Sequence, residues 1–387
     1  MHFIGSMILS WTFAAVPVAV TPLDGAPLTG EFVSGTRESL QLQVGGETRT
    51  IPTKEILEVK VTGPAEAAAE KLHTEIGLTD GGHLSFSTLQ SSQQAVTFEN
   101  PAFGELKLPL TAVANLRFAP LESKHAETWN ALLERERRQD LLVLEKEDVL
   151  DYLEGVISSI DDQSIVFLLD GDEVTVPRDK IFGVIYYRKT TAPPGKFCDV
   201  RLLTGDRIAV KDLTADADAV DVVLASGTKA RLPWTAIQSL DYSLGKVVYL
   251  SSLEPRDVKY TPFFDITWEY TRDRNLDGQK LQLGSTVYER GLCLHSKTVI
   301  RYRIGKDFRR FRAMMGIDKG VSPLGNVNVT IRGDDKILLE TAVRGDDAPQ
   351  PLDVDITGVR DLEIAVDFGD DLDIADHLDL ADALIIK

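Results

Sequence analysis

Apolar positions in the first two-thirds of the chain repeat four times around a proline. Each copy has an apolar residue directly before the proline and two more, four and seven positions after it. Proline cannot donate a hydrogen bond to a sheet ladder, so it ends a strand and fixes φ for a tight turn. An apolar strand and a glycine-marked turn lie upstream of each copy. The four prolines are Pro52, Pro109, Pro177 and Pro233.

The two apolar positions after each proline are expected to point the same way, in a short helical turn that passes into a strand. Small five-stranded barrels close in this manner, and the copies resemble SH3- or Sm-like barrels. We therefore expect four tandem barrel repeats, at residues 21–62, 73–120, 143–190 and 196–245.

A connecting helix is predicted between the second and third repeats, at residues 121–142. Within it Ser123 is a capping residue, and Trp129 belongs to a sparse apolar face opposite a charged one. Two interpretations stay open: a solvated spacer packed on one barrel, or a helix that binds a partner.

Residues 1–20 form a separate segment, nearly free of charge from Ile4 to Val20 and followed by Thr21-Pro22. It is either a signal peptide or an N-terminal strand, and a short membrane anchor is a further alternative. No other segment is long and apolar enough to span a bilayer. Export would place the protein in the periplasm, on the cell surface or in the medium.

Length and charge narrow the class of protein. A chain of 387 residues is expected to form more than one domain. Its net charge is −18, and residues 1–245 carry 22 Lys and Arg against 35 Asp and Glu. Such a surface repels nucleic acid, so we expect no nucleic-acid partner. Cys198 and Cys293 fall in different predicted domains and are expected to be lone buried side chains.

The most informative motif is Arg290–Ser296, followed far downstream by Asp367–Asp371 and Asp376-His377. With its neighbours, this motif makes residues 246–387 resemble the NPCBM family of carbohydrate-binding modules. The resemblance implies a galactose-binding-like jelly-roll β-sandwich that binds sugars and is usually an accessory to catalysis. The chain departs from the family at Leu380, where an aromatic residue is expected, and this removes one sugar-stacking face. The other matching segments are Tyr249–Leu253, Arg272–Arg274, Phe308–Arg312, Gly316–Asp318 and Val354–Gly358.

A sugar site needs a flat apolar face and hydrogen-bonding groups that reach vicinal hydroxyls. Trp268, Tyr270 and Arg272 alternate along one predicted strand, so one face of it offers both. His295 and Asp376-His377 add further polar groups. Alternatively, Trp268 is a core residue and His295 serves a buried backbone group.

Calcium is a second candidate ligand. Asp273, Asn275 and Asp277 match the first half of an oxygen-ligand loop, which Gly278 closes. Asp318, Asp370 and Asp371 are further candidate ligands. The alternative is a solvent-facing Asp-Gly turn. The basic residues from Arg290 to Arg312 are expected to form an outer sheet face, with the aspartate-rich closing segment (Asp367–Asp382) lying across it as ion pairs.

We expect an all-β protein: tandem small barrels, one connecting helix and a C-terminal sandwich. The predicted function is non-catalytic binding of a glycan or glycoconjugate outside the cytoplasm, with the repeats as a spacer or docking array. The sequence contains no G-x-S-x-G, H-E-x-x-H, Walker or paired C-x-x-C motif. Two alternatives stay open: a scaffold that assembles with other cell-envelope proteins without binding sugar, and a glycoside hydrolase with an unfamiliar carboxylate site.

Overall fold

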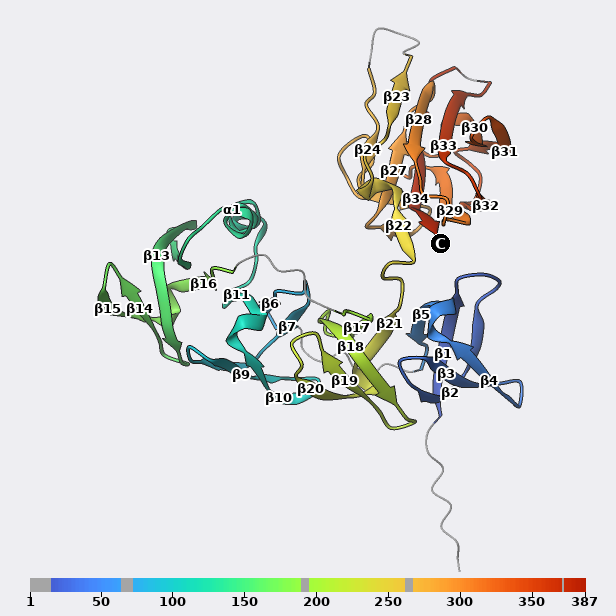
Figure 1. Cartoon of the computed structure of the whole chain (residues 1–387). Helices are drawn as coiled ribbons and strands as arrows, with labels where there is room; N and C mark the ends of the chain where they lie inside the picture. The colour runs from blue at the N-terminus through green and yellow to red at the C-terminus, as the bar shows by residue number, and fades with distance from the viewer. Residues whose placement is uncertain (1–14, 64–71, 189–194, 262–266, 371) are drawn as a thin grey trace, which may run out of the picture. The chain divides into compact units, whose positions relative to one another are not determined.

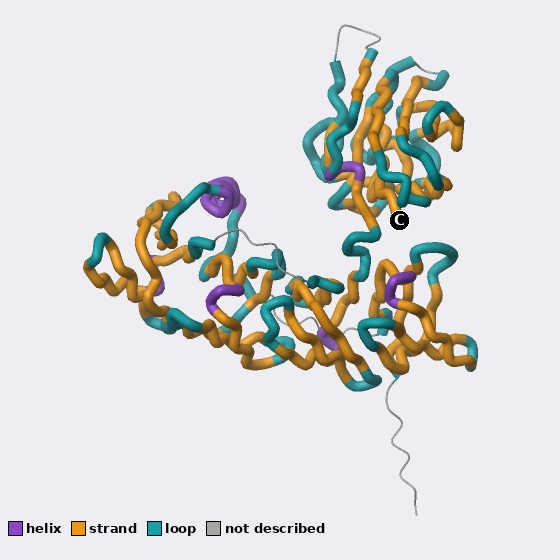
Figure 2. Tube along the Cα trace, viewed as in Figure 1, coloured by secondary structure: helices purple, strands orange, loops and turns teal. Residues whose placement is uncertain are grey.

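A computed structural model describes residues 15–63, 72–188, 195–261, 267–370 and 372–387. The chain divides into two compact units, one ending at Leu244 and the other starting at Gly245. Strands dominate both, and the described residues contain a single α-helix (Figures 1 and 2). The all-β prediction is confirmed.

The strands of the first unit form one 21-stranded sheet made of four similar repeats, and within each repeat the strand order is fifth, first, second, third, fourth. In the second repeat the second strand is split into β7 and β8. The first repeat consists of β1 (Val16–Pro22), β2 (Leu28–Gly35), β3 (Ser39–Val44), β4 (Glu47–Pro52) and β5 (Ile56–Val61). The second consists of β6 (Glu75–Leu78), β7 (His83–Ser85), β8 (Thr88–Ser91), β9 (Ala95–Asn100), β10 (Gly104–Pro109) and β11 (Val113–Arg117). The third consists of β12 (Asp140–Lys146), β13 (Val149–Ile160), β14 (Ser164–Leu169), β15 (Asp172–Pro177) and β16 (Ile181–Ile185). The fourth consists of β17 (Cys198–Leu202), β18 (Arg207–Ala215), β19 (Ala219–Leu224), β20 (Lys229–Pro233) and β21 (Ile237–Asp241).

The proline pattern corresponds to one structural device used four times. Each proline is the last residue of a fourth strand, and a three-residue 3₁₀ turn separates it from the fifth strand. The apolar residue four positions after the proline begins the fifth strand, and the one at seven follows within it. All eight are buried: Ile56, Val59, Val113, Leu116, Ile181, Val184, Ile237 and Leu240. The turns are η1 (Thr53–Glu55), η2 (Leu110–Ala112), η3 (Arg178–Lys180) and η4 (Trp234–Ala236). The resemblance to SH3- or Sm-like barrels stays a prediction.

The repeats do not pair in chain order. The fifth strand of the first repeat pairs with that of the fourth, and the fifth strands of the second and third repeats pair in the same way (Figure 1). In both pairs the apolar residues seven positions after proline face each other, Val59 opposite Leu240 and Leu116 opposite Val184. The second and fourth repeats meet between β7 and β18. The order within this unit is therefore third, second, fourth, first.

The helix is shorter than predicted. It spans Ser123–Glu134 and not residues 121–142. The prediction that Ser123 caps it is wrong, because the N-cap residue is Glu122, whose side chain makes no capping bond. Residues 140–142 belong to β12, because Leu141 and Leu142 are fully buried between β13 and β16. The helix packs Trp129 onto the third repeat, against Phe182.

Part of the N-terminal segment is a strand. Val18 and Val20 are buried in β1, which pairs with both β2 and β5. Residues 1–14 lie outside the described residues, so the signal peptide stays a prediction. None of the helices in the described ranges is long and apolar enough to cross a membrane.

The second unit is a β-sandwich. One sheet has the order β24-β27-β34-β29-β32, with β22 also pairing with β34, and the other has the order β23-β28-β33-β30-β31. The first sheet comprises β22 (Val247–Tyr249), β24 (Thr271–Arg272), β27 (Gly291–Leu294), β29 (Arg310–Ile317), β32 (Gln350–Asp355) and β34 (Leu378–Ile386). The second comprises β23 (Asp257–Tyr260), β28 (Thr298–Arg303), β30 (Asn326–Gly333), β31 (Lys336–Arg344) and β33 (Asp361–Phe368). A 3₁₀ turn, η5 (Leu250–Ser252), and a hairpin of β25 (Leu281–Leu283) and β26 (Thr286–Tyr288) complete the unit.

Two predictions concern the interior. Cys198 and Cys293 are buried and lie in different units, as predicted. The prediction that Leu380 removes a sugar-stacking face is wrong. It is fully buried in the sandwich core, with Leu292 and Met315 as its neighbours across the sheet. An aromatic ring at this position of the chain would enter the core, so its absence says nothing about sugar binding.

Candidate ligand-binding site

Three of the predicted residues form an aromatic cluster at one end of the six-stranded sheet. His295 directly follows β27 and His377 directly precedes β34, and Leu294 pairs with Leu378 in these antiparallel strands. The register therefore brings the two imidazoles to the same end, with ring centroids 5.9 Å apart. Trp268 stacks on His295 at 5.4 Å, with 8° between the ring planes, and lies 5.3 Å from His377.

Burial sets the protonation of the two histidines. Only 2% of His295 and 5% of His377 is exposed, whereas Trp268 is only partly buried. Burial lowers the pKa of both imidazoles, although Asp277 and Asp318 partly offset this for His377. Both rings are therefore neutral at neutral pH, and each has one donor and one acceptor nitrogen. His377 Nδ1 has no hydrogen-bond partner among the described residues.

Asp376 lies inside the unit. It is fully buried, and its Oδ1 accepts a hydrogen bond from the backbone N–H of Asn326 at 2.9 Å. This bond connects the residue before His377 to the start of β30. The position suits an anchor for the cluster better than a direct ligand contact.

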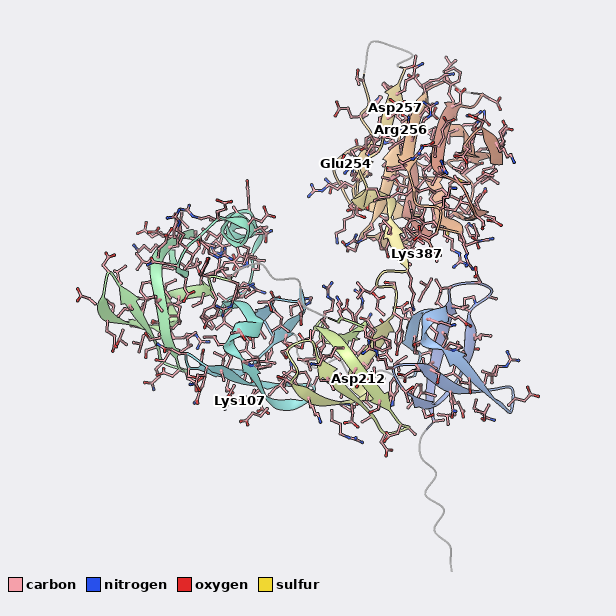
Figure 3. The ribbon with its side chains drawn as sticks, in the orientation of Figure 1. Lys107, Asp212, Glu254, Arg256, Asp257 and Lys387 are labelled. Carbon is pink, nitrogen blue, oxygen red and sulfur yellow. The ribbon has the colours of Figure 1, made fainter. Side chains whose placement is uncertain are left out.

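Tyr270 and Arg272 form a second, separate group. Only Thr271–Arg272 is strand, so the predicted alternation from Trp268 along one strand is wrong. Both terminal nitrogens of Arg272 bind the carboxylate of Glu254 at 2.8 Å, and its guanidinium also donates to the Tyr270 hydroxyl. Glu254 is labelled in Figure 3. Arg272 lowers the pKa of Glu254, and no contact within the described residues joins this group to Trp268.

The predicted calcium loop is closed by its own hydrogen bonds. Asp273 Oδ1 accepts from the backbone N–H of Gly291, and Asn275 Oδ1 accepts from those of Asp277 and Gln279. Asn275 Nδ2 in turn donates to the buried Asp318 at 3.1 Å. These bonds fit the alternative of an Asp-Gly turn.

The other predicted ligands are Asp370 and Asp371. Asp370 is exposed and lies 3.7 Å from Arg344, and Asp371 lies outside the described residues. Within the ranges that the structure describes, no group of three or more His, Cys, Asp or Glu side chains is placed to hold a metal ion. Calcium therefore stays a prediction.

Sequence reasoning missed Asp379, the most unusual carboxyl of this unit. It is fully buried in β34, opposite Cys293 and beside Asp318. Burial, together with the negative charge of Asp318, raises its pKa to about 9. The available signal was an aspartate inside an otherwise apolar run, Leu378–Ala381. All four residues of this run are buried.

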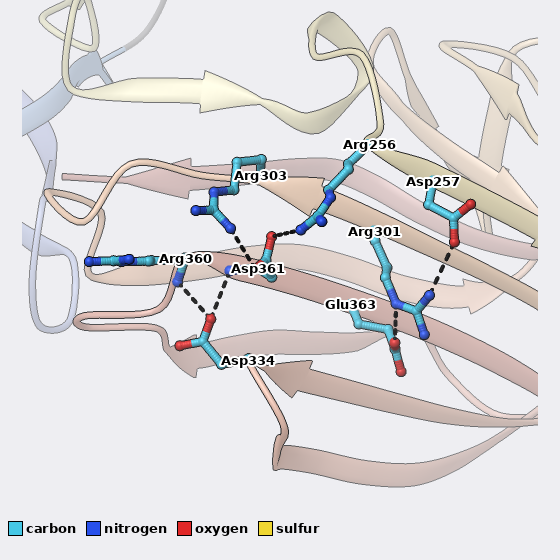
Figure 4. Close-up of polar contacts among 8 residues, drawn as sticks. All are labelled: Arg256, Asp257, Arg301, Arg303, Asp334, Arg360, Asp361 and Glu363. Atoms are coloured by element: carbon cyan, nitrogen blue, oxygen red, sulfur yellow. Dashed lines mark hydrogen bonds and ion pairs between the residues drawn. The ribbon is translucent and has the colours of Figure 1, made fainter.

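The basic run after Arg290 lies partly on the outer face of the five-stranded sheet, where acids neutralise it (Figure 4). These acids are mostly not those of the predicted closing segment, which pairs with the run through Asp367 and Lys297. Glu363 accepts from both Arg301 and Arg332 at 2.6 Å, and Arg301 also pairs with Asp257. Arg303 pairs with Asp361 beside it. Because these charges compensate each other, this face does not attract a polyanion.

Comparison with known proteins gives a family match within the second unit. Residues 246–386 match the family model described as NPCBM/NEW2 domain. A Renibacterium salmoninarum protein described as "Putative endo-alpha-N-acetylgalactosaminidase" is 33% identical over 93 residues, which are 23% of this chain and 6% of that protein. The chain thus spans only a small part of that relative.

Two solved structures from Clostridium perfringens are similar to parts of the chain. The CBM51 of GH95 in complex with methyl-galactose has 22% identity and a TM-score of 0.33, over 36% of this chain and 99% of that one. The CBM51-2 and INT domains of ZmpB have 24% identity and a TM-score of 0.34, over 37% and 32%. With the family match over residues 246–386, the C-terminal unit of this chain is an NPCBM/NEW2 domain.

Proposed function

We propose that the C-terminal unit binds a glycan or glycoconjugate, without catalysis, at the cluster of Trp268, His295 and His377. The observation that carries the proposal is the partly exposed Trp268 ring stacked on a buried, neutral His295. The family match of residues 246–386 supports glycan binding as the general activity.

The cluster has the chemistry that a pyranose requires. The apolar face of a sugar ring packs on an indole, and the His295 ring holds the Trp268 plane in place before the ligand arrives. Neutral imidazoles both donate to and accept from hydroxyl groups. Binding is expected to be weak, because Trp268 is the one partly exposed ring of the three, so little area is buried, and ordered water must be displaced.

The four repeats are proposed to act as a spacer or docking array for this domain, outside the cytoplasm. Strand pairing joins them into one continuous unit, which supports a mechanical role. The scaffold alternative has lost the observation that favoured it, because Leu380 is a core residue.

Glycan-array screening followed by calorimetry on the full chain tests the proposal. Trp268→Ala is expected to weaken binding about tenfold, from loss of roughly 1.5 kcal/mol of ring stacking. Arg272→Ala is the matched control, because Arg272 is engaged by Glu254 away from the cluster. The proposal would be overturned if no glycan binds the chain. It would also be overturned if Arg272→Ala loses binding and Trp268→Ala keeps it.

A further inference from the structure

A polar cavity of about 310 Å³ lies where the second and fourth repeats meet. Chain order does not bring its walls together, since one comes from residues 72–121 and the other from residues 204–206. The side chains that matter for its chemistry are His73, Glu75, His83, Arg117, Thr204 and Asp206. The volume is at the lower end of the range for small-molecule sites, and the lining is mainly polar.

Hydrogen bonds fix this junction before any ligand arrives. Asp206, of which 4% is exposed, accepts from the Ser85 backbone N–H at 2.9 Å and from the Ser85 hydroxyl at 3.0 Å. The amide of Asn100 donates to the same carboxylate at 2.8 Å. His83 Nε2 lies 3.0 Å from the carbonyl oxygen of Gly205, so both walls are tied together by several bonds.

The cavity carries one uncompensated negative charge. Arg117 pairs with Glu75 at 3.2 Å and donates to the carbonyls of His73 and Ala119, so this pair is neutral overall. The three donors on Asp206 are uncharged. A buried carboxylate without a cation favours a positively charged ligand group.

Two further buried atoms have no hydrogen-bond partner among the described residues. They are Thr204 Oγ1 and Arg117 Nε, and both side chains line the cavity. Only 9% of Thr204 and 8% of Arg117 is exposed. Buried polar groups are normally hydrogen-bonded, so these atoms need a polar partner from the cavity. A hydroxyl group serves both, because it can accept from the guanidinium and bond to the threonine.

We propose that this cavity binds a small hydroxylated primary amine, with an amino sugar as the fitting class. The ammonium group balances Asp206, and the hydroxyls satisfy Thr204, Arg117 and the imidazoles of His73 and His83. The inference does not depend on the glycan site of the C-terminal unit, because it uses other residues of another unit.

Titration of the full chain with glucosamine, followed by NMR of ¹⁵N-labelled histidine side chains, tests this proposal. The ring signals of His73 and His83 are expected to shift, while those of His295 and His377 report separately on the other site. Glucose lacks the amine and N-acetylglucosamine has it capped, so both are expected to bind at least about tenfold more weakly.

Asp206→Asn is expected to weaken glucosamine binding at least about tenfold. Asp221→Asn is the matched control, because Asp221 pairs with Arg231 away from the cavity and its loss changes the net charge equally. If Asp206→Asn does not fold, Glu75→Gln provides the same test by leaving Arg117 uncompensated. Any of three results would overturn the proposal. The His73 and His83 signals do not move, glucose binds as well as glucosamine, or the variant that folds keeps full affinity for glucosamine.

Discussion

Replacing Asp379 with asparagine is expected to remove a pH-dependent weakness of the C-terminal unit. The folded unit holds Asp379 protonated up to a pKa of about 9, whereas the ordinary value is 3.8. Below pH 3.8 the carboxyl is neutral in both states and contributes its full stability. Between the two values only the folded state keeps the proton, so stability is lost progressively as the pH rises.

The size of the effect follows from this window. Each pH unit between 3.8 and about 9 lowers the free energy of unfolding by about 1.4 kcal/mol. At neutral pH the accumulated loss is about 4 kcal/mol. Asparagine does not titrate, so the free energy of unfolding of Asp379→Asn lacks this dependence on pH. The substitution itself is expected to cost about 1–2 kcal/mol at every pH, because the amide replaces a carboxyl group in a buried site.

Cys293 provides the assay, because it is fully buried opposite Asp379 and becomes reactive only when the unit opens. The full chain is exposed to a thiol reagent in increasing urea at several values from about pH 5 to about pH 8. Peptide mass spectrometry separates Cys293 from Cys198. Wild type and variant are compared at the same pH, so the chemistry of the thiol cancels.

The stability advantage of Asp379→Asn is expected to grow steadily with pH. A difference that stays constant over the whole range would refute the reasoning, because Asp379 would then be ionised in the folded state. Asp353→Asn controls for the loss of one negative charge, since Asp353 is a surface carboxylate paired with Arg310.

Three further results are expected. Leu240→Glu puts a charge into the fully buried contact with the first repeat. A calorimetric melt is therefore expected to show several kcal/mol of destabilisation of the first unit. An unchanged melt contradicts the pairing. Burial lowers the pKa of His295 and His377 below the usual 6.5. Glycan affinity, measured by calorimetry, is therefore expected to stay constant from neutral pH to below 6.5 and then to fall. A fall that begins above pH 6.5 would show that the two rings are not neutral there. If the Asp273–Asp277 loop holds calcium, EGTA lowers the melting temperature of the second unit, and an unchanged value rejects the ion.

The four repeats could be predicted from local sequence patterns, but the strand pairing between repeats could not. Pro52 and its three equivalents fix a strand end and a turn within a few residues, so the burial of Ile56 and Val59 was predictable. The contact of Val59 with Leu240 depends on which of four similar edges meet, and the four copies look alike in sequence. The helix was predicted too long because Leu141 and Leu142 suit either a helix or a buried strand.

The site was predicted in part. The motif around His295 and the Asp376-His377 pair marked two strand ends, and the pairing of β27 with β34 brings them together. Trp268 lies in the cluster with both histidines, but the strand alternation that pointed to it is wrong, since it lies outside any strand. The pairing of Arg272 with Glu254 could not be predicted, because Glu254 precedes it by 18 residues and carries no motif of its own.

The pairing of the first repeat with the fourth has a consequence during synthesis on the ribosome. The second and third repeats are neighbours in the chain, so their shared edge closes as soon as the third emerges. The first repeat must wait until Ile237–Asp241 has been translated, with the edge of β5 unsatisfied meanwhile. Unpaired strand edges promote aggregation, so nascent or truncated chains that stop before the fourth repeat are the aggregation-prone species of this protein.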